Sequence, residues 1–75
     1  MRELVEYIAR NLVDNPDEVR VVEREEENAF IIEISVASDD MGKVIGKQGR
    51  IAKAIRTVVK AASIKSPKKY VVEIV

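Results

Sequence analysis

The sequence predicts an α/β (α+β) two-layer sandwich with the element order α-β-β-α-α-β and a three-stranded mixed sheet. Apolar residues recur at helical spacing near the N-terminus and again after residue 50, whereas residues 29–37 alternate between apolar and polar side chains. The stretch between the second and third expected strands, residues 38–69, is long enough for the crossover that two parallel, adjacent strands require. With 75 residues, 47% of them hydrophobic, the chain is expected to form one domain over residues 1–75.

The first element is expected to be a helix from Arg2 to Val13. Its apolar residues fall on one stripe, made of Leu4, Val5, Ile8 and Leu12. The helix is expected to end at Asp14-Asn15-Pro16, because the residue before a proline disfavours the helical conformation.

Two strands joined by a hairpin are expected next, over residues 19–24 and 29–37, with the polar run 25–28 as the turn. In the second strand Phe30, Ile32 and Ile34 lie on one face. These three side chains are expected to be covered by the helices, which would pack on one side of the sheet. The last strand is expected over residues 70–75.

A short helix is expected over residues 39–44, before the turn Gly46-Lys47-Gln48-Gly49. Ser38 is its expected N-cap, and Asp39 and Asp40 lie in its first turn, where acidic side chains are favourable. The two aspartates are interpreted as helix-start residues and not as a catalytic or metal-binding pair. Sequence neighbours point apart on a helix, and the chain contains no histidine.

A longer helix is expected from Arg50 to Ala62, with an apolar stripe and a basic face. The stripe consists of Ile51, Ile55, Val58, Val59 and Ala62. Lys53, Arg56 and Lys60 lie opposite it. An ordinary solvated face and a contact surface explain Arg56 and Lys60 equally well, whereas Lys53 lies close to the turn and is the better candidate for a ligand contact.

The turn Gly46–Gly49 has the chemistry of a clamp for a phosphate backbone. Its glycines allow close approach, and a turn that opens a helix offers unpaired N–H groups at the positive end of the helix dipole. A Walker A loop is excluded, because only three residues separate Gly42 from Gly46 and Gln48 stands where a hydroxyl is needed. The dinucleotide-binding fingerprint would need a glycine in place of Val44.

The run from Gly42 to Ala62, GKVIGKQGRIAKAIRTVVKAA, resembles the KH domain of RNA-binding proteins, in which a GXXG loop holds a nucleic-acid backbone. The whole chain is similar to the small bacterial single-KH proteins of the KhpA type. The resemblance implies the type II KH topology. One departure is Ala52, where many KH domains have a large aliphatic residue three positions after the second glycine; Ile51 lies one place earlier.

The resemblance also implies a site for single-stranded RNA in a groove between the glycine turn and the sheet edge. Gly46, Lys47, Gln48 and Gly49 would hold the backbone, with charge from Lys43, Arg50 and Lys53. Val44, Ile45 and Ile51 are candidates for an apolar surface under the bases, although core packing explains Ile45 equally well. No catalytic residue, metal or cofactor is expected. The family further implies a homodimer, or a heterodimer with a second KH-containing protein.

The two halves of the chain have opposite charge although the net charge is zero. Residues 1–40 contain four basic and twelve acidic side chains, whereas residues 41–75 contain nine basic side chains and one acidic. This asymmetry fits a face for a polyanion, or two halves that attract one another. The chain lacks cysteine and any apolar run of membrane-spanning length, so a cytoplasmic protein without a membrane segment is expected.

Two alternatives remain open from the sequence. The protein is either an RNA-binding regulator or RNA chaperone, or a protein–protein adaptor or dimerisation module whose nucleic-acid binding is weak or vestigial. Nothing in the sequence distinguishes RNA from single-stranded DNA. Ile64 falls off the helical stripe, so its side chain either turns inward or is exposed as a contact for a second copy. An enzyme is not expected, because the chain has no histidine, no cysteine and no convergent acid–base group.

Overall fold

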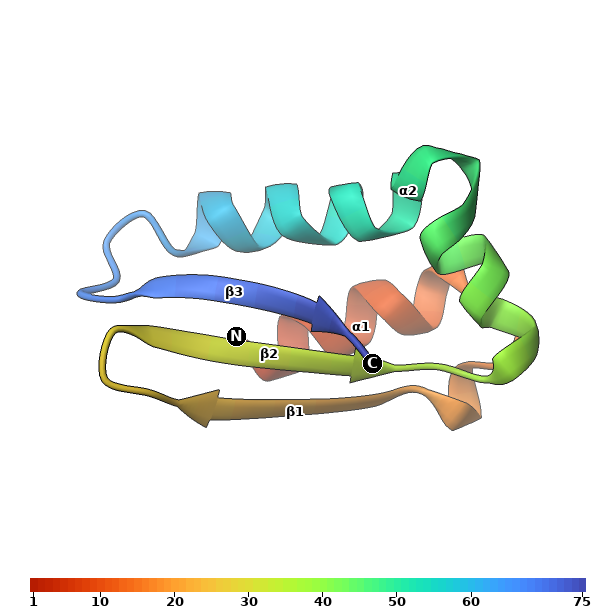
Figure 1. Cartoon of the computed structure of the whole chain (residues 1–75), viewed down its shortest axis with the longest axis horizontal. Helices are drawn as coiled ribbons and strands as arrows, with labels where there is room; N and C mark the ends of the chain where they lie inside the picture. The colour runs from red at the N-terminus through yellow and green to blue at the C-terminus, as the bar shows by residue number, and fades with distance from the viewer.

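The computed structural model describes residues 1–46 and 49–75, and the side chains of Lys47 and Gln48 lie outside the described part. Its elements are α1 (Arg2–Leu12), the 3-10 turn η1 (Pro16–Glu18), β1 (Arg20–Glu25), β2 (Ala29–Ser35), α2 (Ser38–Ala62) and β3 (Lys69–Ile74). Figure 1 shows the strands in one layer, with α1 behind them and α2 beside β3. The expected strands are confirmed; β2 begins where expected, at Ala29, and the other strand boundaries are shifted by one or two residues.

The sheet is mixed and has the order β1-β2-β3. Strands β1 and β2 pair antiparallel through the short hairpin, with Val21 opposite Ile34. Strands β2 and β3 pair parallel, with Ile32 opposite Val72. The long crossover through α2 makes this parallel pairing possible, because a tight turn joins only antiparallel strands. The predicted topology of a type II KH domain is confirmed.

The two helices expected in the crossover form a single element, α2, which changes direction along its length (Figure 1). Gly49 has φ 67°, a left-handed conformation that is incompatible with a regular right-handed helix. A short arm therefore precedes this glycine and a long arm, residues 50–62, follows it. The glycine turn is preserved as a bend between the two arms.

The core lies between the two helices and one face of the sheet. Ile32 and Ile34 of β2 are almost fully buried against Val5 and Ala9 of α1 and against Ile55 and Val59 of α2. Phe30, expected in the same layer, is only partly buried and stacks on Tyr70 with ring centroids 4.9 Å apart. The prediction for the buried face of β2 is thus confirmed for the two isoleucines and partly for Phe30.

The predicted stripe of α1 was wrong at its edges. Val5 and Ala9 are buried, whereas Leu4 and Leu12 are 38% and 42% exposed. Successive residues of a helix are rotated by about 100°, so a stripe centred on Val5 and Ala9 leaves Leu4 at its margin. Ala9, which is not one of the predicted stripe residues, is 1% exposed and belongs to the core.

The second face of the sheet is open to solvent and is organised by Arg24. Its guanidinium pairs with Glu33 at 2.6 Å, with Glu26 at 3.3 Å and with Glu73 at 3.9 Å. Hydrogen bonds to Glu33 and then to Glu26 raise the pKa of Arg24. Ile31 is buried on this face, between Arg24 of β1 and Val71 of β3 in the sheet register. Three carboxylates around one cation leave this face unsuited to a polyanion.

The start of α2 is fixed by the buried carboxylate of Asp40. Its two oxygens accept hydrogen bonds from the backbone N–H groups of Asp14, at 3.1 Å, and Asn15, at 3.0 Å, and from the Asn15 side-chain amide at 3.1 Å. The expectation that Ser38 is the N-cap was wrong: Ala37 is the N-cap, and its carbonyl accepts from the N–H of Asp40 and Met41. Asp40 therefore joins the short arm of α2 to the segment after α1.

We expect Asp40→Ala to lower the free energy of unfolding by about 2–4 kcal/mol, because two part-buried backbone N–H groups would lose the buried carboxylate that accepts from them. The measurement is urea or thermal unfolding followed by circular dichroism. Asp39→Ala is the matched control, since Asp39 is exposed in the same helical turn and its loss should cost less than about 1 kcal/mol. Equal losses in the two variants would contradict the structural role given to Asp40.

Candidate nucleic-acid interface

The bend of α2 places two glycines at the surface. Among the described residues, a β-carbon built on Gly46 or Gly49 would have no neighbouring atom within 4 Å. Packing inside the protein therefore does not require a glycine at either position. The left-handed conformation accounts for Gly49, whereas at Gly46 the missing side chain leaves the backbone open to an external group. Lys47 and Gln48, predicted to meet the phosphates, lie outside the described residues.

The three residues before Gly46 have different environments. Lys43 forms an ion pair with the carboxylate of Asp14, so it would bind a phosphate only by leaving that partner. Val44 is 1% exposed and belongs to the interior, where a base cannot reach it. Ile45 is 59% exposed, which removes core packing as its explanation. Of the two apolar candidates before the turn, the structure leaves only Ile45 accessible.

The residues after Gly49 begin the long arm of α2. Arg50 and Lys53 are exposed, as a role in charge neutralisation requires. Ile51 is half-buried and packs against the core, so only part of its side chain faces outward. Ala52 is buried; the small residue at this position, noted as a departure from many KH domains, therefore belongs to the interior.

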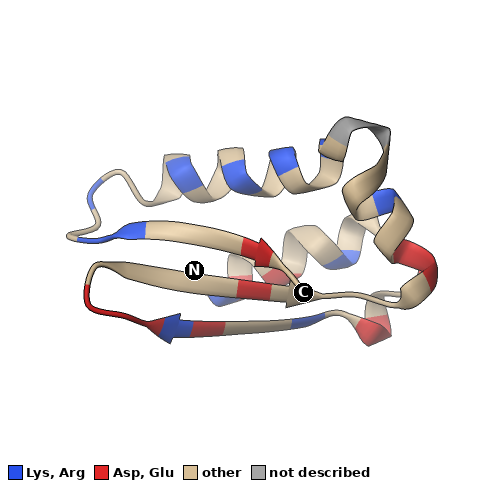
Figure 2. Ribbon diagram, in the orientation of Figure 1, with Lys and Arg blue, Asp and Glu red and all other residues tan. Residues whose placement is uncertain are grey.

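The basic side chains of the second half of the chain divide into two groups. Lys43 pairs with Asp14, and Lys68 pairs with Glu25 at 2.6 Å, so the two halves of the chain do attract one another in places. Within residues 1–46 and 49–75, six further cations form no ion pair: Arg50, Lys53, Arg56, Lys60, Lys65 and Lys69. Figure 2 shows lysine and arginine recurring along the long arm of α2 and at the start of β3.

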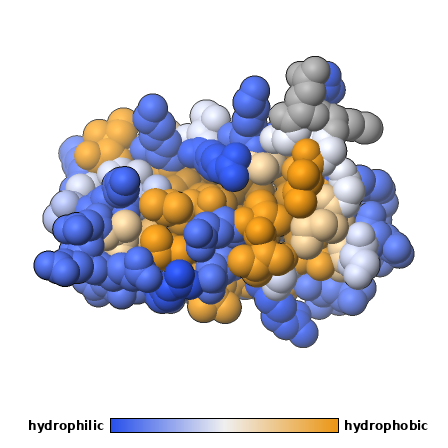
Figure 3. Space-filling model, viewed as in Figure 1, coloured by the Kyte–Doolittle hydropathy of each residue, from blue (hydrophilic) through white to orange (hydrophobic). Residues whose placement is uncertain are grey.

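An apolar surface accompanies these cations. Figure 3 shows hydrophobic side chains following the junction between α2 and β3 and continuing over β3, with hydrophilic side chains on both sides. The unpaired cations of α2 thus border an apolar strip. A single strand of nucleic acid complements this arrangement, because its anionic phosphates can meet the cations and the faces of its bases can meet the apolar strip.

Two residues outside the sequence-predicted site belong to the same junction. Lys69 is exposed and Tyr70 is partly buried, both at the start of β3 beside the long arm of α2. Burial raises the pKa of Tyr70, and the nearby charge of Glu23 adds to the effect, so its phenol stays neutral at physiological pH. The sequence placed both residues only at the beginning of the last strand, and the folded chain alone brings β3 next to α2.

Residues 2–74 match the family described as KhpA/KhpB, KH domain. Relatives named "RNA-binding protein KhpA" are 65% identical in Clostridium perfringens and 63% identical in Clostridium acetobutylicum, in both cases over all 75 residues of this chain and the full length of the relative. The chain belongs to the KhpA/KhpB KH-domain family. A Bacillus subtilis relative of the same name is 49% identical over 99% of this chain and 91% of its own length. No solved structure matches the chain.

Family membership confirms the predicted resemblance and the predicted fold. It also agrees with the expectation of a binding domain instead of an enzyme, since these relatives are named for RNA binding. In the described part of the chain, no helix combines the length and the apolar character needed to cross a membrane.

We expect the two glycines of the turn to respond differently to alanine. Gly49→Ala should lower the free energy of unfolding by about 1–2 kcal/mol, because alanine is strained in the left-handed conformation. Gly46→Ala should leave it unchanged or raise it by up to about 1 kcal/mol, since alanine favours helix and meets no described neighbour. Urea unfolding of the two single variants measures both effects. A larger loss for Gly46→Ala would contradict this assignment of the two glycines.

Proposed function

We propose that residues 1–75 act as one KH domain that binds single-stranded RNA along the junction of α2 and β3. The observation that supports this most directly is the row of unpaired cations on the long arm of α2, beside an apolar strip and next to the open glycine turn. The names of the full-length relatives support RNA as the ligand.

In this proposal the backbone N–H groups around Gly46–Gly49 and the side chains of Lys47 and Gln48 hold the RNA phosphates. Arg50 and Lys53 neutralise the adjacent charge, and Lys43 contributes when it leaves Asp14. Ile45 and the exposed part of Ile51 lie under the bases, whereas Val44 supports the turn from the interior. Aliphatic contacts distinguish bases poorly, so the sequence preference should be modest.

A domain this small should bind weakly by itself, and we propose that pairing compensates for this. A homodimer, or a heterodimer with a second KH-containing protein, would bring two weak sites onto one RNA and raise the overall affinity through effective concentration. The family description, which joins KhpA and KhpB, supports a partner of the same domain type. A cytoplasmic post-transcriptional regulator or RNA chaperone fits weak, broadly specific binding.

The double substitution Lys47→Asp with Gln48→Asp is expected to abolish RNA binding and to change the free energy of unfolding by no more than about 0.5 kcal/mol. The physical reason is that two carboxylates would replace the cation and the amide proposed to face the phosphates. Fluorescence anisotropy with a labelled single-stranded RNA measures binding, and far-UV circular dichroism checks the fold.

The matched control is Arg10→Asp with Asn11→Asp, which makes the same charge change on two exposed, neighbouring residues of α1. This control should bind RNA nearly as well as the unchanged protein. If the turn variant binds as well as the control does, the turn is not the RNA site. An unchanged complex with a protein partner would then favour the adaptor alternative.

RNA affinity should fall with added salt. If about two to four phosphates are neutralised, the slope of log K against log[salt] should lie near −1.4 to −2.8 for a single strand. Repeating the anisotropy titration at several salt concentrations gives the slope. A flat response would mean that the unpaired cations of α2 do not face the RNA. Parallel titrations with single-stranded DNA of the same sequence test whether the 2′-hydroxyl contributes.

For pairing, Ile64 offers a specific test. Its side chain is 79% exposed, so of the two possibilities left by the sequence, the inward-turned one is wrong. We expect a homodimer in which Ile64 and the small-residue flank of α2, Ala54 and Ala61, meet their symmetry mates. Ile64→Lys should then give a folded monomer by light scattering with weaker RNA binding. A monomeric unchanged protein, or a variant that stays dimeric, would exclude this surface.

A further inference from the structure

A pocket of about 750 Å³ lies at the far end of the α2–β3 junction from the glycine turn. Its walls come from the last turns of α2, the connection 63–68 and the first half of β3. Gly49 and Arg56 are seven residues apart on α2, which corresponds to about 10 Å along the helix axis. The pocket is therefore a separate concavity on the same face, beyond the residues assigned to the turn.

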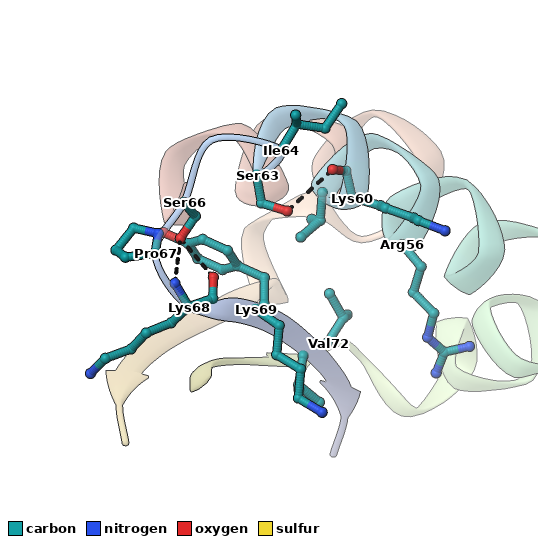
Figure 4. Close-up of a pocket in the computed structure, with 12 residues that line it drawn as sticks. Arg56, Lys60, Ser63, Ile64, Ser66, Pro67, Lys68, Lys69 and Val72 are labelled. Atoms are coloured by element: carbon teal, nitrogen blue, oxygen red, sulfur yellow. Dashed lines mark hydrogen bonds between the residues drawn. The ribbon is translucent and has the colours of Figure 1, made fainter. Parts of the chain in front are cut away.

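The pocket has an apolar floor and a basic rim. Val59 and Val72 are buried at its base, and partly buried Tyr70 lines it. Three exposed cations stand around the opening, Arg56, Lys60 and Lys69, and none of them forms an ion pair with any described residue. Figure 4 shows Arg56 and Lys60 reaching outward from α2 and Lys69 from β3, with Val72 between them.

The connection that closes the pocket is held in place by its own hydrogen bonds. The Ser66 hydroxyl donates to the carbonyl of Lys68 at 2.7 Å and accepts from its N–H at 3.3 Å (Figure 4). Lys68 then reaches the β1–β2 hairpin, donating to Glu25 at 2.6 Å and to the carbonyl of Glu26 at 2.9 Å. Lys68 is thus used within the protein, and the other three cations remain for a ligand.

Charge complementarity selects the occupant. A second copy of this chain seated with its pocket over this one would bring like charges together, which is unfavourable. The dimer contact proposed above uses Ile64 at the edge of the pocket, whose side chain points away from Val72 (Figure 4). An anionic ligand with an apolar ring matches a basic rim over an apolar floor. A nucleotide has both parts, and the size of the pocket is sufficient for a base and its sugar.

We propose that this pocket is an additional nucleotide position: a single strand held at Gly46–Gly49 continues along α2 and places a further base on Val59, Val72 and Tyr70. Arg56, Lys60 and Lys69 neutralise the phosphates on either side of that base. This inference rests on the proposed RNA-binding function. It extends the footprint beyond the roughly four nucleotides that a GXXG loop clamps.

The test compares two oligonucleotides, one of about four nucleotides and one of about eight. Arg56→Gln with Lys60→Gln should weaken binding of the long strand about tenfold and leave the short one within about twofold, because the pocket cations meet only the longer strand. The salt slope for the long strand should fall by about 1.4, the loss of two phosphate contacts. Arg2→Gln with Arg10→Gln, two exposed cations of α1, is the control for lost charge and should leave both affinities unchanged.

An optical readout reports on the pocket itself. The chain has two tyrosines and no tryptophan, so in a Tyr7→Phe background the fluorescence comes from Tyr70 alone. The long strand should quench this fluorescence and the short strand should not. Uridine monophosphate, added alone, tests whether the pocket binds a free nucleotide instead of part of a continuous strand. If uridine monophosphate quenches Tyr70 saturably and the long oligonucleotide binds no more tightly than the short one, the continuous-strand proposal is overturned.

The remaining outcomes separate this inference from the proposed function. Suppose that the turn variant, Lys47→Asp with Gln48→Asp, binds neither oligonucleotide, while the pocket variant, Arg56→Gln with Lys60→Gln, keeps full affinity for the long one. The pocket inference is then wrong and the proposed function stands. If the turn variant binds both oligonucleotides with unchanged affinity, the proposed function itself fails. If the pocket variant changes the oligomeric state by light scattering without changing RNA affinity, the pocket is a protein contact and the inference is overturned.

Discussion

The buried carboxylate of Asp40 is the interaction on which the geometry of the candidate site depends. One side chain accepts hydrogen bonds from two backbone N–H groups after α1 and thereby fixes where the short arm of α2 begins. Six residues later the chain reaches Gly46, so the position of the glycine turn is set by this anchor. A buried carboxylate is stable only when its oxygens are satisfied, which makes the arrangement specific as well as rigid. Lys43, which pairs with Asp14, adds a second tie between the same two segments.

The distribution of ion pairs then determines which face remains for an anion. On the open face of the sheet, Arg24 is surrounded by Glu26, Glu33 and Glu73, so its charge is used within the protein and three carboxylates stand beside it. Lys68 is used to hold the connection before β3 against the hairpin. Among the described residues, the cations of the long arm of α2 and Lys69 are left without such partners, and they border the apolar junction with β3. The zero net charge of the chain conceals this separation.

Much of the fold could be predicted because it depends on local patterns. The alternation of Ile32 and Ile34 identified the buried face of β2, and the glycines of the turn identified the bend of α2. Features that depend on contacts between distant segments could not be predicted in this way. Asp40 resembled an ordinary residue of a helix start, and its hydrogen bonds to Asp14 and Asn15 exist only in the folded chain. Likewise, the pocket needs β3 beside α2, so Lys69 and Tyr70 gave no signal as site residues.

The most direct test of the account is a map of backbone amide signals by NMR during titration with a single-stranded RNA. The largest chemical-shift changes are expected in the glycine turn and the long arm of α2, residues 46–60, and at the start of β3, residues 69–72. The amide chemical shifts of β1, Arg20–Glu25, should hardly change, because β1 lies at the edge of the sheet away from β3 and its Arg24 is held in ion pairs. Changes concentrated on β1 or α1, with the turn unaffected, would contradict the proposal that RNA lies along the α2–β3 junction.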